Sequence, residues 1–220
     1  MGYRFVKGHG TENDFVLLPD PDGLVHGALA AERVRALCNR RAGIGGDGVL
    51  RVIRSAALAE LLDIGAVRSE WFMDYRNADG SLSEMCGNGL RVFVRFLVAE
   101  GLVAEEVALA GFSVATRAGD KAVRLLPDGR ITIDLGVGES RGETSVTVGE
   151  REIPAVDIRT GNPHAVAFVG ALAEAGALAA APGFDAARYP EGVNVEFVTW
   201  VGPRHVAMRV FERGVGETRS

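Results

Sequence analysis

Cys86 has the sequence context of a reactive thiol. It is followed by Gly87, Asn88 and Gly89 and then by an apolar run over 90–97 whose spacing predicts a buried helix. A thiol at that place would face free backbone N–H groups and the positive end of the helix dipole, which lower a thiol pKa and favour the thiolate. A substrate carboxylate would bind the same N–H groups. The alternative is a buried cysteine beside a helix cap, and the local pattern leaves both open.

Five asparagines occupy strand ends or glycine-containing loops, where a side-chain amide can meet a ligand. They are Asn13, Asn77, Asn88, Asn162 and Asn194. Asparagine is common in turns, so each one taken alone has a structural explanation. Together they predict an amide-lined pocket, because amides hold both a carboxylate and an ammonium without adding net charge.

Four other residues call for the same comparison of a functional and a structural explanation. Glu212 and Arg213, at a predicted strand end, would clamp a charged amino-acid group, or they form a solvated surface ion pair. His164 would tune a nearby thiol, or it caps a loop. Cys38 falls on the apolar stripe of a helix predicted over 30–40, so we expect it in the core.

The composition excludes several classes of protein. Of the 220 residues 47% are apolar, and the formal net charge is −5. A sizeable core is therefore expected, and neither nucleic acid nor a membrane is the expected partner. No run of 18 apolar residues occurs and the N-terminus lacks the apolar block of a signal peptide, so we expect a cytoplasmic protein. Two cysteines and four separated histidines predict no disulfide scaffold and no metal site.

A glycine-rich segment over 43–48 matches the pattern Gly-x-Gly-x-x-Gly. It follows a predicted helix and precedes a predicted strand, which is the reverse of the order in a dinucleotide-binding fold. The segment is therefore interpreted as a glycine-rich loop that could contact a ligand.

The elements that must position these residues are many short strands and few helices. This pattern predicts the α+β class. Strands are predicted over 5–7, 15–18, 49–53, 71–75, 107–110, 113–116, 122–126, 130–135, 151–158, 165–169, 193–200 and 205–211, and helices over 30–40, 90–97 and 171–181. Turn signals place a domain boundary near residue 128, which gives an N-terminal domain over 1–128 that carries Cys86 and a C-terminal domain over 129–220.

Five segments of the sequence form a distinctive set. They are FVKGHGTENDF at 5–15, YRNADGS at 75–81, MCGNGLR at 85–91, GNPH at 161–164 and ERGVGET at 212–218. With these segments in this order, the sequence resembles the diaminopimelate epimerase family. The resemblance implies a cofactor-independent epimerase that interconverts LL- and meso-diaminopimelate in lysine and peptidoglycan precursor synthesis. It also implies two pseudo-symmetric domains, each a curled β-sheet around a central helix, with the site in the cleft between them. A small-molecule amino-acid substrate and a homodimer are the implied partners.

The resemblance also assigns roles to residues. Cys86 is implied as one of two catalytic cysteines, which take and return the α-proton on opposite faces of the substrate. His164 and Glu212 are implied to tune the thiols, whereas Gly48 stands where many members carry a glutamine ligand, so that contact is not carried over. The implied substrate ligands are Asn13, Asn77, Gly87, Asn88, Asn162, Asn194, Glu212 and Arg213.

The second cysteine of the family directly follows the Gly-Glu-Thr-x-x segment and opens the central helix of the second domain. This sequence ends at Ser220, one residue earlier, and Cys38 lies at a non-matching position. We therefore expect the second domain to be incomplete as given, in a truncated form of an intact enzyme. Two alternatives stay open, which are a short non-catalytic ligand-binding form and a related two-base isomerase of another amino acid.

Overall fold

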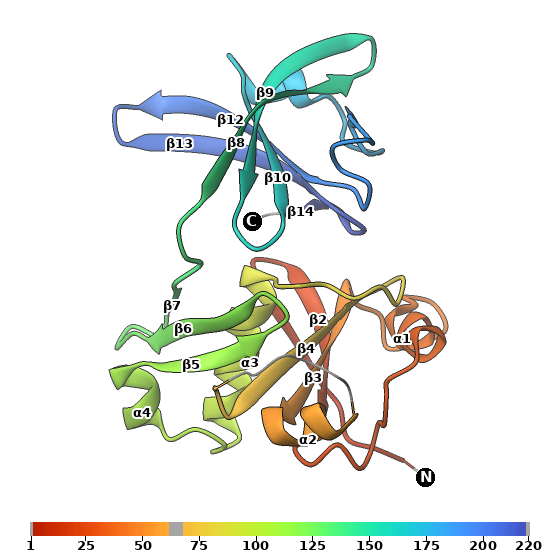
Figure 1. Cartoon of the computed structure of the whole chain (residues 1–220), viewed down its shortest axis with the longest axis vertical. Helices are drawn as coiled ribbons and strands as arrows, with labels where there is room; N and C mark the ends of the chain where they lie inside the picture. The colour runs from red at the N-terminus through yellow and green to blue at the C-terminus, as the bar shows by residue number, and fades with distance from the viewer. Residues whose placement is uncertain (1, 62–67, 219–220) are drawn as a thin grey trace. The chain divides into compact units, whose positions relative to one another are not determined.

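The described part of the chain, residues 2–61 and 68–218, forms two seven-stranded sheets, one in each of two units (Figure 1). The structure is a computed structural model. Unit 1 is Met1–Leu135 and unit 2 is Gly136–Ser220. The division falls after residue 135 rather than after the expected residue 128, because β7 (Ile131–Ile133) pairs with β6 (Gly119–Leu125) and so belongs to the first sheet.

The sheet of unit 1 follows chain order from β1 to β7. The strands before β6 are β1 (Val6–Gly10), β2 (Asn13–Pro19), β3 (Gly48–Arg54), β4 (Trp71–Asn77) and β5 (Phe112–Thr116). The register places Gly48 opposite both Phe15 and Asn77. The starts of β2 and β3 therefore meet the end of β4 at one end of the sheet.

Helix α3 (Gly87–Ala99) packs against one face of this sheet, as the apolar spacing over 90–97 predicts (Figure 1). Leu90, Phe93 and Leu97 are fully buried in a core that the sheet completes. The helix comes close to β1 because Gly10 has no side chain: an added Cβ there would lie 2.9 Å from the carbonyl oxygen of Asn88.

The opposite face of the sheet is covered by α1 (Ala31–Cys38) and α2 (Ser55–Leu61). It also holds a buried cluster of charges centred on Asp74. The carboxylate of Asp74 lies 2.6 Å from Arg51 Nη2, 3.0 Å from Arg76 Nε and 2.5 Å from Arg117 Nη2. Asp74 and Arg51 are both fully buried, so their charges depend on each other for compensation.

The sheet of unit 2 has the strand order β11-β8-β9-β10-β12-β13-β14. These strands are β8 (Glu139–Val148), β9 (Arg151–Arg159), β10 (Pro163–Phe168), β11 (Gly183–Phe184), β12 (Asn194–Gly202), β13 (His205–Glu212) and β14 (Gly216–Thr218). One face packs against the segment that joins β10 to β12, with Phe197 and Val195 at the centre of that core. The described residues of this unit contain no α-helix.

Two element predictions are wrong. Residues 107–110 lie in α4 (Glu105–Ala110) rather than in a strand; Glu105 and Glu106 fill the favourable first turn of this helix. Residues 171–181 form only one 3₁₀ turn, η1 (Leu172–Ala175), because Gly176 follows with a φ of 66° and ends it. No prediction covered β8, whose first five residues are exposed and carry no alternating pattern.

The remaining predicted strands and helices are present, so the α+β class is confirmed. In unit 1 the curled sheet around a central helix is also as expected. No helix among the described residues is long and apolar enough to cross a membrane.

Candidate active site

Cys86 occupies the N-cap position of α3, with extended backbone angles of φ −142° and ψ 119°. The backbone N–H of Gly89 donates to Cys86 Sγ across 3.4 Å. An N–H donor at a helix N-terminus favours the negatively charged sulfur. The side chain is partly exposed rather than enclosed in the core, so the structure favours the accessible thiol over the buried alternative.

Asn13 lies beside this sulfur at the start of β2. Its Oδ1 accepts from Cys86 Sγ at 3.7 Å, and its side chain is 2% exposed. The Nδ2 of the same amide donates to Asp47 Oδ2 at 2.8 Å. Asn13 is therefore held between a thiol and a carboxylate, which satisfies both ends of its amide.

Asn77 and Asn88 complete the polar side chains of unit 1 at this end of the sheet. Asn77 ends β4, and its Nδ2 donates to Ser81 Oγ at 2.9 Å, which closes the turn that follows. Asn88 lies in the first turn of α3, and its Oδ1 accepts from Thr11 Oγ1 at 2.9 Å and from Arg91 Nη2. The structure therefore brings Asn13, Asn77, Cys86, Gly87 and Asn88 to one end of the unit 1 sheet, as a common site requires.

In unit 2 a second polar group is built around His164. Its Nδ1 lies 2.7 Å from Glu196 Oε1, and its Nε2 lies 2.8 Å from Asn162 Oδ1. Glu196 is a partner that the sequence analysis missed, although it stands on β12 beside the strand that begins with Pro163. A carboxylate on Nδ1 fixes the orientation of the His164 ring.

Asn194 joins the ends of two strands in the same unit. Its Nδ2 donates to the carbonyl oxygen of Pro163 at 3.2 Å, and its Oδ1 accepts from the backbone N–H of Arg213 at 2.9 Å. Glu212 accepts from Thr218 Oγ1 at 2.7 Å. The structure thus brings Asn162, His164, Asn194, Glu212 and Arg213 to one end of the unit 2 sheet.

Cys38 does not belong to either group. It is buried on α1, and burial raises its pKa to about 11. Such a thiol is protonated at neutral pH and behaves as a small core residue, as the helical pattern predicted.

The loop over 43–48 contributes a residue that the sequence analysis did not single out. The loop lies between α1 and β3, which is the predicted order, and its one carboxylate, Asp47, reaches Asn13. The sequence could have pointed to Asp47, because it is the one acidic residue in this glycine-rich loop. Gly48, next to it, faces the ring of Tyr75: an added Cβ would lie 2.5 Å from Cε2, so this backbone has no room for a glutamine.

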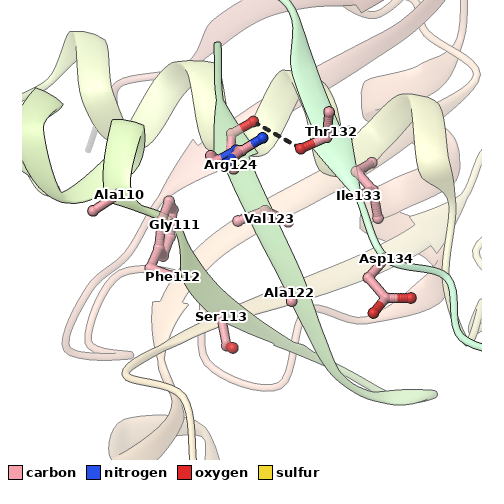
Figure 2. A pocket seen from close by; sticks show the side chains of 10 residues that line it. All are labelled: Ala110, Gly111, Phe112, Ser113, Ala122, Val123, Arg124, Thr132, Ile133 and Asp134. Atoms are coloured by element: carbon pink, nitrogen blue, oxygen red, sulfur yellow. Dashed lines mark hydrogen bonds between the residues drawn. The ribbon is translucent and has the colours of Figure 1, made fainter.

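A groove of about 640 Å³ lies elsewhere in unit 1, over β5, β6 and β7 (Figure 2). Small side chains such as Ala110, Ser113 and Ala122 line it, and Thr132 Oγ1 donates to the carbonyl oxygen of Arg124 at 3.3 Å. It contains none of the predicted site residues. In the described residues no group of three or more His, Cys, Asp or Glu side chains is placed to hold a metal ion.

Comparison with known proteins gives a consistent result. The family model described as diaminopimelate epimerase matches residues 5–140 and 156–220. A protein of Streptomyces coelicolor named diaminopimelate epimerase is 56% identical over 218 residues, which cover 98% of this chain and 73% of that protein. One of the same name from Thermobifida fusca is 51% identical over 220 residues, or 99% of this chain and 78% of that protein.

Solved structures of lower similarity share the fold. A probable proline racemase from Agrobacterium radiobacter K84 has a TM-score of 0.67 at 12% identity, covering 98% of this chain and 72% of that chain. A hydroxyproline epimerase from Agrobacterium vitis has a TM-score of 0.65 at 13% identity, with the same coverage. Since the family model matches most of the sequence and named relatives are more than half identical to it, this chain belongs to the diaminopimelate epimerase family.

Proposed function

We propose that this protein interconverts LL- and meso-diaminopimelate, with Cys86 as one of two thiol groups that move the α-proton. The observation that carries the proposal is Cys86 itself, a partly exposed thiol at the N-cap of α3 in a chain 56% identical to a protein named diaminopimelate epimerase. The reaction then belongs to the synthesis of lysine and of peptidoglycan precursors.

The chemistry follows from the surroundings of the sulfur. The Cys86 thiolate takes the α-proton: the C–H bond breaks, an S–H bond forms, and the electron pair moves from the α-carbon into the substrate carboxylate. The N–H groups of the first turn of α3 are suited to stabilise the charge that develops there. A second thiol, on the opposite face, donates the proton that completes the inversion. No cofactor is needed in this scheme, because the carboxylate receives the charge.

The polar residues of the two units are proposed as substrate ligands. In unit 1 these are Asn13, Asn77, Gly87 and Asn88, and in unit 2 they are Asn162, Asn194, Glu212 and Arg213. Amides and an arginine suit a substrate with several carboxylates and ammonium groups. His164, oriented by Glu196, and Glu212 are proposed to set the charge around the thiols.

A catalytic thiol must remain reduced, and this requirement supports a cytoplasmic location, where thiols are kept reduced. Cys38 does not supply the second thiol in this proposal, because it is buried and its pKa is about 11.

The test is isotope exchange with the full-length protein in deuterated water. We expect deuterium at the α-carbon of diaminopimelate after incubation with the LL isomer, together with formation of the meso isomer. Proline, 4-hydroxyproline and glutamate serve as comparison substrates. Exchange into one of these, with none into diaminopimelate, would refute the assignment.

A further inference from the structure

The amide of Asn13 is held in one orientation by a carboxylate behind it. Asp47 Oδ2 accepts from Asn13 Nδ2 at 2.8 Å, while Asn13 Oδ1 faces Cys86 Sγ at 3.7 Å. A carboxylate can only accept hydrogen bonds, so it selects the nitrogen end of the amide. The oxygen end must then point at the thiol.

Asp47 has three N–H donors converging on its two oxygens. Besides Asn13 Nδ2, the backbone N–H of Asp14 donates to Oδ2 at 3.0 Å and Arg40 Nη2 donates to Oδ1 at 2.8 Å. An asparagine at this position would place an NH₂ group against at least one of these donors. The arrangement is therefore satisfied by an ionised aspartate and not by its amide.

The backbone of Asp47 is fixed as well. Its N–H donates to the carbonyl oxygen of Asp14 at 2.7 Å, and its own carbonyl oxygen accepts from Ala78 N–H at 3.1 Å. Ala78 directly follows Asn77, so one residue ties together the two segments that carry Asn13 and Asn77. The side chain of Asp47 is 19% exposed and Asn13 is 2% exposed, so water offers little competition for the bond between them.

We infer that Asp47 is a positioning residue that acts on Cys86 through Asn13, by fixing the amide oxygen against the sulfur. This orientation favours the protonated thiol, since Oδ1 accepts the S–H proton, whereas Gly89 N–H favours the thiolate. The two contacts balance the two states between which an acid/base sulfur must alternate. The catalytic consequence rests on the proposed function, but the effect on the thiol does not.

Asp14 provides a matched control for the charge of Asp47. It belongs to the same ion-pair cluster, where Arg40 Nη2 donates to its Oδ1 at 2.6 Å and Lys7 Nζ to its Oδ2 at 2.5 Å. No contact joins its carboxylate to Asn13. Asp14→Asn therefore removes the same charge from the same cluster without releasing the amide.

The experiment measures the pH dependence of alkylation of Cys86 by iodoacetamide, followed by peptide mass spectrometry. In Asp47→Asn the midpoint is expected to move to lower pH by roughly half a unit, since the amide oxygen is no longer fixed on the sulfur. Asp14→Asn should give a clearly smaller shift. Equal shifts in the two variants would mean that only the charge matters, and the inference would fall.

A double-mutant cycle tests whether the effect passes through Asn13. On an Asn13→Ala background, the shift of the midpoint caused by Asp47→Asn should shrink to the small, charge-only shift that Asp14→Asn gives. A shift as large as in the wild-type background would overturn the inference. If Asp47→Asn does not fold, Asn13→Ala alone takes its place, because it removes the amide oxygen from the sulfur without changing a charge: a shift of the midpoint to lower pH supports the inference and no shift refutes it.

Activity is measured separately on the same variants. Asp47→Asn is expected to lower kcat/KM for diaminopimelate by about tenfold, while Asp14→Asn changes it much less. If the wild-type protein does not act on diaminopimelate but the alkylation shift occurs, the proposed function fails and the positioning role stands. If the wild-type protein is active and the alkylation shift is absent, the proposed function stands and the positioning role of Asp47 fails.

Discussion

The two cysteines show how far the surroundings of a residue decide its chemistry. Each lies at one end of a helix: Cys86 directly precedes α3, and Cys38 is the last residue of α1. Cys86 caps the N-terminus of α3 and is partly exposed, whereas Cys38 is near the C-terminus of α1 and buried. Position relative to the helix end is therefore the basis on which we predict Cys86, and not Cys38, to be the reactive thiol.

The difference predicts selective labelling. At pH 8 iodoacetamide should alkylate Cys86 and leave Cys38 unmodified in the folded protein. The pKa of Cys38 is about 11 because of burial, so its thiolate fraction becomes substantial only as the pH rises toward that value. Cys86→Ala should lower isotope exchange at least about a hundredfold. Cys38→Ala should retain exchange and lose about 1 kcal/mol of stability. Labelling of Cys38 before Cys86 would show that the thiols are assigned the wrong way round.

The sequence alone predicted a set of candidate site residues and could not predict the side chains that support them. Asn13 and Cys86 lie in segments whose residue types suggest chemistry, and the structure places them in contact. Asp47 and Glu196 act through contacts made across the sheet, between segments that are more than thirty residues apart. Such pairings depend on strand order and register, which no local pattern specifies.

At the scale of elements, α3 is the part of the fold that the sequence specified best. Its apolar residues recur at helical spacing, and Cys86 with the glycines marks its start. The predictions for 107–110 and 171–181 were wrong for different reasons. A short apolar run does not distinguish a strand from one turn of helix, and alanine content does not compensate for a glycine at a φ of 66°.

The buried charges around Asp74 predict how the sheet of unit 1 responds to acid. Burial alone would raise the pKa of Asp74, but Arg117, Arg76 and Arg51 outweigh that effect and lower it. A lowered pKa means that the stabilising contribution is present above the unfolded value, near 3.9, and is lost as the pH falls through the folded value.

Asp74→Asn should therefore destabilise the protein by about 3 kcal/mol or more at pH 7, since it leaves buried arginines without their partner. Thermal melting from pH 7 down to pH 3 should show the wild type and the variant converging below about pH 4. Asp128→Asn is the control, because Asp128 pairs with Arg130 on the exposed surface and should change the melting temperature little. A constant difference across this pH range would contradict the assigned role.

At the scale of the whole chain, the two units share a plan and differ in how their sheets are covered. In unit 1 both faces are packed, one by α3 and the other by α1 and α2. In unit 2 the described residues cover one face, around Phe197. The family resemblance predicted two related sheets, and the comparison structures confirm that fold, but the extent of covering depends on long-range packing that only the structure shows.

The second face of the unit 2 sheet carries a group of exposed apolar side chains. Phe168 and Trp200 stack with ring centroids 6.0 Å apart, and they are 55% and 65% exposed. Val206 lies opposite Trp200 on the neighbouring strand β13, and Met208 is two residues further along that strand. Side chains of this kind in a continuous group bind apolar probes from solution.

The two tryptophans of the sequence make this face measurable. In a polypeptide of residues 1–220, acrylamide should quench the fluorescence of Trp200 strongly and that of Trp71, which is 2% exposed, only weakly. Trp200→Glu should remove the quenchable component, reduce the binding of an apolar dye and change stability by no more than about 0.5 kcal/mol, because it replaces a surface side chain. Trp71→Phe is the matched control and should leave dye binding unchanged. Equal, weak quenching of both tryptophans would show that the face around Phe168 and Trp200 is shielded from solvent.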